Sequence, residues 1–443
     1  YVSSGDTLYR VKKKFEDEYQ ILKKDGKMYG VRETGEEDAL YINDGDGHFS
    51  KANSEEYFSY SENSSGLPSD WGLHAAFRDI NNDGYLDIYV NNDFWTPDRI
   101  WINKGDGTFR GVKPRSVRNL SLSSMGADFS DVNRDGAVDI FVTDMLSRKH
   151  KRRLSQRTPA PFFPTRKIES RPQYKRNSLY LNRGDNTYAE VSYFSGVAAS
   201  EWSWATRFMD VDLDGYEDLI INTGFSYDYQ DLDTQRRIAR KWAQSSTTDR
   251  SLTDYPSLHL ENVAFHNDAD LTFSERGSEW GLAEDRDISH GLATADFDND
   301  GDLDLAISRL NQVSSVYENK ITQPRIAVRL SGDAPNARGI GAKVTLSGGK
   351  GRGAPQQRQI TTGDYLSGSQ PLVVFAADPE NTDHTIQVTW NDGSKKTIEN
   401  VRHNRIYEII KPSVEDAAPR PEDGVESASG PQKTIFADVS RRI

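Results

Sequence analysis

One nine-residue phrase occurs four times in this chain: DINNDGYLD at 79–87, DVNRDGAVD at 131–139, DVDLDGYED at 210–218 and DFDNDGDLD at 296–304. Every copy has oxygen-bearing side chains at positions 1, 3, 5 and 9 and a glycine at position 6, where the backbone must turn sharply. Such a loop can surround Ca²⁺, a hard cation that takes roughly six to eight oxygen ligands. The phrase therefore predicts about four structural Ca²⁺ ions, one for each loop.

The predicted ligands lie at positions 1, 3, 5, 7 and 9 of each loop. They are Asp79, Asn81, Asp83, Tyr85, Asp87, Asp131, Asn133, Asp135, Ala137, Asp139, Asp210, Asp212, Asp214, Tyr216, Asp218, Asp296, Asp298, Asp300, Asp302 and Asp304. We expect structural rather than catalytic metals, because each loop supplies a closed set of protein oxygens.

A helical EF-hand shares this opening, but it needs a bidentate Glu at position 12 and a helix on each side. Position 12 here holds Val90, Val142, Ile221 and Ile307. Each loop also leads into a short β-branched or aromatic stretch, such as residues 88–90, which is typical of strands. The sequence therefore excludes an EF-hand and places the loops between strands.

A second repeated phrase predicts β-hairpins. Apolar or aromatic residues precede an asparagine and a turn that is Gly-Asp in most copies; the asparagines are Asn43, Asn103, Asn182 and Asn267. They precede the first aspartate of the next loop by 36, 28, 28 and 29 residues. This near-constant spacing indicates one module of several strands, and repeats of roughly 40 to 50 residues with four strands each are typical of propeller blades. We therefore expect an all-β fold, a β-propeller.

The innermost strand of each blade is expected just before its loop. Small residues recur there, among them Gly126, Ala205 and Gly291, which suits strands that crowd around a propeller axis. From loop to loop the spacing is 52, 79 and 86 residues, so the two longer intervals contain insertions. Downstream, alternating apolar residues such as Ile326, Val328 and Leu330 predict a small antiparallel β-sandwich.

The expected organisation has five parts. They are an irregular N-terminal part (1–39), propeller blades (40–322) with insertions at 145–176 and 225–261, a sandwich (323–411), a linker (412–433) and a tail or further unit (434–443). The motif Gly339-x-Gly341 is not a dinucleotide loop, because Val344 replaces the third glycine and no helix is expected after it.

Composition limits the function classes. The net charge of −13 argues against nucleic acid as a partner, and much of it would be offset by Ca²⁺ at the loops. The chain has no cysteine, which excludes disulfides and thiolate metal sites. No stretch approaches the roughly 18 apolar residues of a membrane span. The chain starts at Tyr1 rather than Met. We interpret it as a piece of a longer, exported protein that lies at the cell surface, outside the cell or in the periplasm.

The loops and their hairpins resemble FG-GAP (VCBS) repeats, the blades of integrin-α-type propellers. The segments 338–345, 362–367 and 388–393 are similar to the ASPIC/UnbV domain of the cartilage acidic protein family and its large exported bacterial relatives. This resemblance implies a seven-bladed propeller followed by the sandwich, and with four full units visible we expect that some blades are either missing from this chain or degenerate. An integrin-like receptor head is excluded, because no inserted α/β metal domain is evident.

The two insertions are candidates for partner binding. Residues 145–176 carry eleven Lys or Arg against one Glu, Glu169. This stretch either packs on acidic blade rims as a solvated loop or binds an anionic glycan or an acidic protein. The insertion 225–261 contains an expected helix at 233–244 and would cap one face of the propeller.

The preferred hypothesis is a non-catalytic binding, adhesion or scaffolding module, within a larger cell-surface assembly, whose partner is a protein or an anionic glycan. The alternative is a propeller enzyme that acts on a glycan or small metabolite. His74, Arg207 and His290, with Trp202 and Trp204, would line its funnel. No nucleophile elbow, HExxH motif or phosphate loop supports catalysis. Convergence of His74, Arg207 and His290 would favour the enzyme, and an apolar plug would oppose it.

Overall fold

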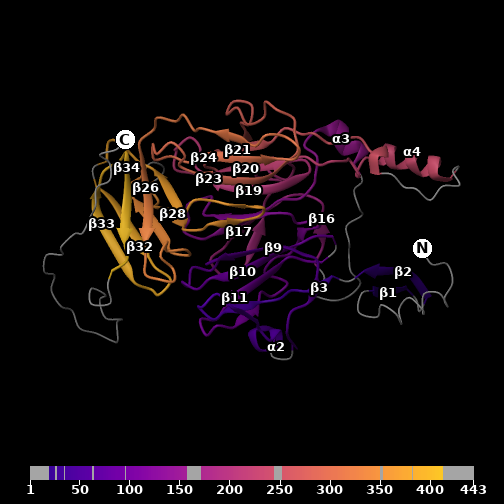
Figure 1. The fold of residues 1–443 in the computed structure, drawn as a ribbon, viewed down its shortest axis with the longest axis horizontal. Coiled ribbons are helices and arrows are strands. Elements are labelled where there is room, and N and C mark those ends of the chain that lie inside the picture. Colours follow the sequence, from indigo (N-terminus) through magenta and orange to yellow (C-terminus); the bar gives the residue numbers. More distant parts are fainter. Residues whose placement is uncertain are drawn as a thin grey trace.

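A computed structural model describes residues 19–24, 27–33, 35–61, 64–94, 96–156, 171–243, 252–349, 353–381 and 383–412. The predicted linker beyond Pro412 and the unit at 434–443 lie outside these residues. The regular secondary structure of the described chain is almost entirely β-strand, as the sequence predicted (Figure 1).

Four blade sheets follow one another along the chain, each numbered from its inner strand outward. The first contains β9 (Gly72–Arg78), β10 (Asp87–Asn92), β11 (Arg99–Asn103) and β12 (Phe109–Gly111). The second contains β14 (Ala127–Ser130), β15 (Asp139–Val142), β17 (Ser178–Asn182) and β18 (Tyr188–Glu190). The third contains β19 (Ser203–Met209), β20 (Asp218–Thr223), β21 (Val263–Asn267) and β22 (Phe273–Glu275). The fourth contains β23 (Ser289–Ala295), β24 (Asp304–Arg309) and β25 (Ser315–Tyr317).

Every predicted metal loop connects the first and second strands of a blade, as the sequence indicated. The inner strands β9, β14, β19 and β23 lie next to one another in this order. Both insertions connect the second strand to the third. Because neighbouring strands are antiparallel, the insertions lie at the opposite end of the blades from the loops.

Apolar side chains pack between consecutive blades. Leu179 of the second blade packs against the third and is 1% exposed, whereas Val316, at the same repeat position in the fourth blade, is 67% exposed. At the other end of the array, Tyr41 is 56% exposed, whereas its counterpart Tyr180 is 1% exposed. The blades of the described residues therefore form an open array of the propeller type.

Short elements extend the first blade on its outer side. The strands β6 (Phe58–Ser61) and β7 (Ser64–Ser65) join its sheet, with β6 parallel to β12. Smaller pairs are β1 (Tyr19–Lys24) with β2 (Lys27–Glu33), β3 (Glu36–Glu37) with β8 (Ser69–Asp70), β4 (Tyr41–Asn43) with β5 (Phe49–Lys51), and β13 (Leu120–Ser121) with β16 (Gln173–Tyr174). The short helix α2 spans Ser54–Tyr57.

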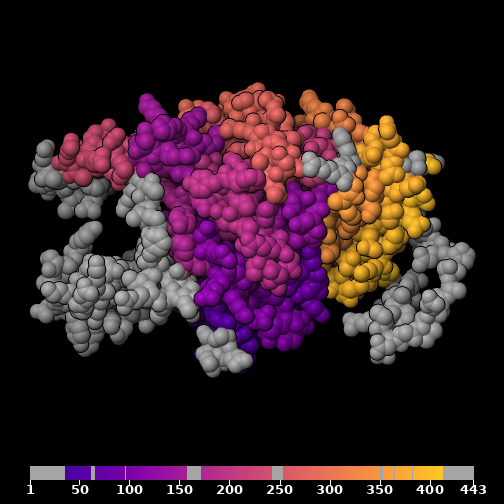
Figure 2. Space-filling view, turned by 180° about the vertical axis from the view of Figure 1, so that it is seen from behind, coloured from indigo at the N-terminus to yellow at the C-terminus, as the bar shows by residue number. Residues whose placement is uncertain are grey.

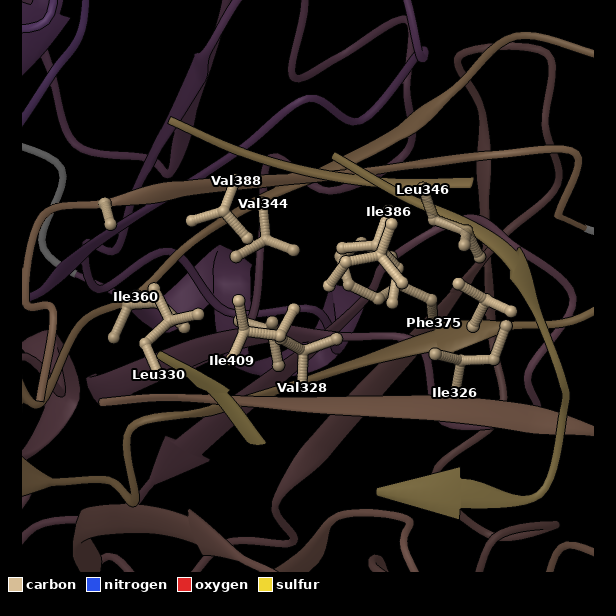
Figure 3. Packing of buried hydrophobic residues seen from close by; sticks show 14 of the residues in the cluster. Ile326, Val328, Leu330, Val344, Leu346, Ile360, Phe375, Ile386, Val388 and Ile409 are labelled. Carbon is tan, nitrogen blue, oxygen red and sulfur yellow. The ribbon is translucent and has the colours of Figure 1, made fainter. Parts of the chain in front are cut away.

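The C-terminal domain is the expected sandwich. One sheet contains β26 (Arg325–Ser331), β31 (Leu372–Ala376) and β34 (Arg405–Ile410), and the other contains β27 (Lys343–Ser347), β28 (Gln356–Gln359), β32 (His384–Thr389) and β33 (Lys395–Val401). The pairs are antiparallel except β26 with β34, which is parallel. Val328 and Phe375 from one sheet meet Val344 and Ile386 from the other in an apolar core (Figure 3).

The insertions contribute the remaining helices, α3 (His150–Ser155), α4 (Leu232–Ala243) and the 3₁₀ turn η1 (Leu252–Asp254). Helix α4 confirms the helix expected in the second insertion. Figure 1 shows α3 and α4 at one end of the blades and the sandwich at the other. Within the described residues, no helix has the length and apolar character that crossing a membrane requires.

Candidate metal centres

A shared backbone frame holds the four loops. The carboxylate at position 1 accepts hydrogen bonds from backbone N–H groups across the turn; Gly84, Gly136, Gly215 and Gly301 donate to it at 2.9–3.2 Å. The carboxylate at position 9 accepts two bonds, one from the N–H at position 2 and one from the N–H of the hairpin asparagine. In the third loop these are Val211 N at 2.8 Å and Asn267 N at 2.9 Å, both to Asp218.

The hairpin asparagines also join neighbouring blades, which the sequence did not reveal. The Asn182 amide donates to the Ile80 carbonyl of the first loop at 3.1 Å, and the Asn267 amide donates to the Val132 carbonyl of the second loop at 2.9 Å. Asn319 repeats this contact with Val211 of the third loop. The near-constant spacing between each hairpin asparagine and the next loop was the only hint of this contact in the sequence. That spacing did not indicate which blade the asparagine side chain reaches.

Burial raises the pKa of the loop carboxyl groups. The pKa of Asp87 rises to about 7, that of Asp131 to about 6 and that of Asp210 to about 8, in each case mainly through burial and further through neighbouring carboxylates. Burial also raises the pKa values of Asp139 and Asp218 well above the usual range. These loops therefore crowd acidic groups at a cost that a bound cation would remove.

The predicted carboxylate ligands come together in the third and fourth loops. Oxygen atoms of Asp210, Asp212 and Asp218 lie within 4.8 Å of one another, and so do those of Asp296, Asp298 and Asp300. Buried oxygens of Asp212 and Asp296 have no hydrogen-bond partner among the described residues. An all-oxygen donor set with unpartnered carboxylate oxygens fits Ca²⁺.

The position-7 residues differ among the loops. Tyr85 has an exposed ring, and its backbone N–H donates to Asp83 at 2.9 Å. Asp302 is 1% exposed, and neither of its carboxylate oxygens has a hydrogen-bond partner among the described residues. The fourth loop thus offers a further buried oxygen donor where Ala137 stands in the second.

His266 is a residue of the third site that sequence reasoning missed. Its Nε2 lies 3.2 Å from Asp212 and 3.8 Å from Asp214, and its Nδ1 lies 3.1 Å from Asp268. It stands where the preceding hairpins have Ile42, Ile102 and Leu181, so an unusual residue in the repeat was the available signal.

A hairpin of the sandwich, β29 (Gly363–Asp364) with β30 (Ser367–Gly368), inserts among the inner strands. The Tyr365 ring lies 5.6 Å from the His74 ring, and it packs so close to Gly126 that a Cβ there would meet it at 3.2 Å. A Cβ at Gly291 would meet the Leu366 carbonyl at 2.5 Å. These glycines therefore make room for the hairpin as well as for crowded strands.

The candidate funnel residues do not all lie together. His74 contacts Asn91 at 3.0 Å, and the His290 ring lies 4.4 Å from the Trp204 ring. Arg207 lies 4.0 Å from Asp128 and lines a cavity of about 80 Å³ between blades and sandwich, whose lining does not include either histidine. Trp202 stacks on Phe225 of the second insertion at 4.2 Å and belongs to the apolar cluster that contains Tyr365, against which Trp204 also packs.

Five cations of the basic insertion already have partners within the chain. Arg148 pairs with Glu275, Lys149 with Glu261, Arg152 with Glu201 and Asp228, and Arg176 with Glu190, while Arg171 donates to the Val117 and Asp98 carbonyls. These pairs agree with the first of the two alternatives from the sequence, in which the insertion packs on acidic rims of the blades. Residues 157–170 lie outside the described residues.

Comparison with known proteins agrees with the resemblance seen in the sequence. Residues 332–416 match the family described as ASPIC and UnbV, and residues 24–90 and 79–142 match FG-GAP-like repeats. Cartilage acidic protein 1 of Xenopus tropicalis is 26% identical over 372 residues, which cover 81% of this chain and 48% of that protein. The chain thus spans about half the length of this curated relative.

Two solved structures are similar at 14% identity and a TM-score of 0.29. One is an Agrocybe aegerita lectin that recognises non-reducing terminal N-acetylglucosamine, with 68% of this chain and 66% of that chain covered. The other is the exotype rhamnogalacturonan lyase YesX, with 86% and 64% covered. At this TM-score neither carries an argument about ligand or activity.

Proposed function

We propose that this chain, which combines FG-GAP-like repeats with an ASPIC and UnbV domain and is a distant homologue of a cartilage acidic protein, is a calcium-binding, non-catalytic binding or scaffolding module. The observation that carries the proposal is the set of four oxygen-only loops with buried, crowded carboxylates between the first two strands of each blade. We place it outside the cell, at its surface or in the periplasm, where calcium is abundant enough to fill weak sites.

Ca²⁺ has a stabilising role in this proposal. The residues at positions 1, 3, 5 and 9 hold the ion, with a further oxygen from position 7. A ligand that binds only the folded state stabilises it by roughly 2.7 kcal/mol per site at a hundredfold excess over Kd. The ion supplies the countercharge that the buried aspartates lack.

The partner surface in this proposal is the insertion end of the blades. Helix α4 exposes Arg236, Arg237, Arg240 and Lys241 on a segment that extends away from the blades (Figure 1). Aromatic residues of the same insertion, including Phe225 and Tyr229, anchor its base against Trp202. A cationic face on an anchored insertion suits binding to an anionic glycan or an acidic protein. We therefore favour α4 in the second insertion, rather than the first insertion, as the partner-binding site.

The enzyme alternative has less support. It required an open funnel where His74, Arg207 and His290 converge, and the Tyr365 ring lies against His74 in that region. Catalysis would also require a nucleophile and an oriented base there, and no such pair is seen among the described residues.

Equilibrium dialysis with ⁴⁵Ca²⁺ tests the metal proposal. We expect about four ions per chain, and loss of one ion on Asp296→Ala. Asp185→Ala, which changes an exposed hairpin aspartate, is the matched control and should leave the number unchanged. A chain that binds no Ca²⁺ at millimolar concentration would refute the proposal.

Surface binding to heparin and to polyglutamate tests the partner proposal. The variant with Arg236, Arg237, Arg240 and Lys241 all changed to Gln should lose at least about tenfold in affinity for one of these probes at low salt. Arg276→Gln, at an exposed blade cation paired with Glu279, is the control. Unchanged binding by the α4 variant would move the partner site elsewhere.

A further inference from the structure

The sandwich packs against one side of the blades (Figure 2), at the opposite end from α3 and α4. Because the insertions lie opposite the predicted metal loops, this is the end that carries the loops. Position 4 of each loop is not a predicted ligand, and in all four loops it has a left-handed backbone, with φ of 61° at Asn82, 59° at Arg134, 53° at Leu213 and 64° at Asn299. This conformation points a non-ligand side chain out of the loop. The first three of these side chains contact the sandwich.

Each contact has its own chemistry. The Asn82 carbonyl oxygen accepts from Lys343 Nζ at 3.0 Å, and Arg134 donates to the Ala354 carbonyl. Leu213 is 1% exposed and packs against Ala327, Leu372 and Val374 of the sandwich sheet. Asn299 of the fourth loop is exposed.

Cations of the sandwich also reach acidic groups of the loops. Arg358 lies 2.8 Å from Glu217, at position 8 of the third loop, and Arg325 lies 2.8 Å from Asp300, at position 5 of the fourth loop. Both arginine side chains are largely buried, so these pairs exist only while the sandwich is seated. The loops therefore form part of the surface that the sandwich contacts.

The hairpin that carries Tyr365 depends on the same seating. Its flanking residues bond to the inner strand β23, with Ser369 Oγ accepting from Thr294 N at 3.1 Å and Gln370 N donating to the Thr294 carbonyl at 2.9 Å. If the sandwich moved away from the loops, this hairpin would leave its place beside His74 and Gly126.

We infer that the metal loops are the docking surface for the C-terminal sandwich, so that filling the loops with Ca²⁺ locks the sandwich onto the blades and seats the Tyr365 hairpin among the inner strands. The inference rests on the proposed calcium binding. Without the ion, repulsion among the crowded carboxylates loosens the loops, and the position-4 side chains lose the arrangement that fits the sandwich. Calcium thereby controls access to the inner strands near His74.

Intramolecular energy transfer in the full chain tests this inference. Because the chain has no cysteine, Arg110→Cys in β12 and Glu399→Cys in β33 give two unique exposed labelling positions. We expect the transfer efficiency to fall when Ca²⁺ is chelated and to recover when Ca²⁺ is restored. Hydrogen exchange at residues 366–372 should accelerate by at least about tenfold over the same change.

A matched pair of position-4 variants separates docking from metal binding. Leu213→Asp should lower the transfer efficiency in saturating Ca²⁺ while the number of bound ions stays unchanged, and Asn299→Asp should alter neither. A chain that binds Ca²⁺ but keeps the same efficiency and exchange after chelation would overturn this inference and leave the proposed function intact. A chain that binds no Ca²⁺ would overturn both.

Discussion

The blades and the sandwich are both built from short β-strands, yet they bury different side chains where their layers meet. The sandwich packs Val328, Val344 and Phe375 in one apolar core. The blades divide their apolar residues among several smaller clusters and also bury carboxylates, including Asp87, Asp139 and Asp218. We therefore expect the stability of the sandwich to rest mainly on apolar burial, and that of the blades to depend also on countercharge at their buried carboxylates.

Calcium removal should separate the two regions most strongly. We expect chelation to remove roughly 2.7 kcal/mol per filled site from the blades, because the buried aspartates lose their countercharge. Region-resolved hydrogen exchange should show lower protection in β10, β15, β20 and β24, while β27 and β32 keep theirs. Equal loss in both regions, or none in the blades, would remove the distinction.

The pH dependence of the metal-free chain should differ in sign between the regions. Asp87 and Asp210 have folded-state pKa values of about 7 and 8, above the unfolded value, so the folded blades bind more protons. Their contribution to stability is complete below about pH 4 and is lost as the pH rises through 7 to 8. The sandwich buries His384, and burial lowers the pKa of this histidine. The contribution of His384 to the stability of the sandwich is therefore lost as the pH falls below its unfolded pKa.

Urea denaturation of the calcium-free chain at pH 5 and pH 8 measures this difference. The blades should be more stable at pH 5 than at pH 8, by several kcal/mol, since each unit of pKa shift corresponds to about 1.4 kcal/mol. Saturating Ca²⁺ should reduce the dependence, because the ion replaces the protons. Metal-free blades that are more stable at pH 8 would contradict the account of their carboxylates.

A large-to-small substitution should affect the sandwich without regard to metal. Phe375→Ala removes a fully buried ring from the core and should cost about 3–5 kcal/mol of sandwich stability, equally with and without Ca²⁺. Thermal melting in both conditions checks this, with Phe194→Ala, at an exposed phenylalanine outside the loops, as the control. A cost that appears only in Ca²⁺ would mean that the sandwich core depends on the loops.

The same contrast explains what the sequence could predict. The loops, hairpins and inner strands follow from residues close in sequence, since a repeated phrase and its spacing report local geometry. The seating of Tyr365 beside His74 and the pair of Arg358 with Glu217 join residues more than a hundred positions apart. No local pattern in the sequence distinguishes Arg358 from a surface cation. The sequence explained Gly126 only by the crowding of inner strands, and it gave no sign that the glycine also makes room for Tyr365. The ion pairs of Arg148 and Arg152 were foreseen only as one of two alternatives.

The smallest expected effect compares two loops within the blades. Asp212→Asn gives the third loop the position-3 residue that the first two loops have at Asn81 and Asn133. One charge fewer should weaken Ca²⁺ binding at this loop severalfold, roughly 1 kcal/mol, because ligand charge tunes the affinity of such loops. In chelator the same change should instead stabilise the third blade, because it relieves repulsion at Asp210 and Asp218. Calcium titration and melting in chelator measure the two signs. If the variant were destabilised to the same extent with and without Ca²⁺, the cause would be the lost contact between Asp212 and His266 rather than the lost charge. The number of carboxylates in a loop would then not explain how the loops differ.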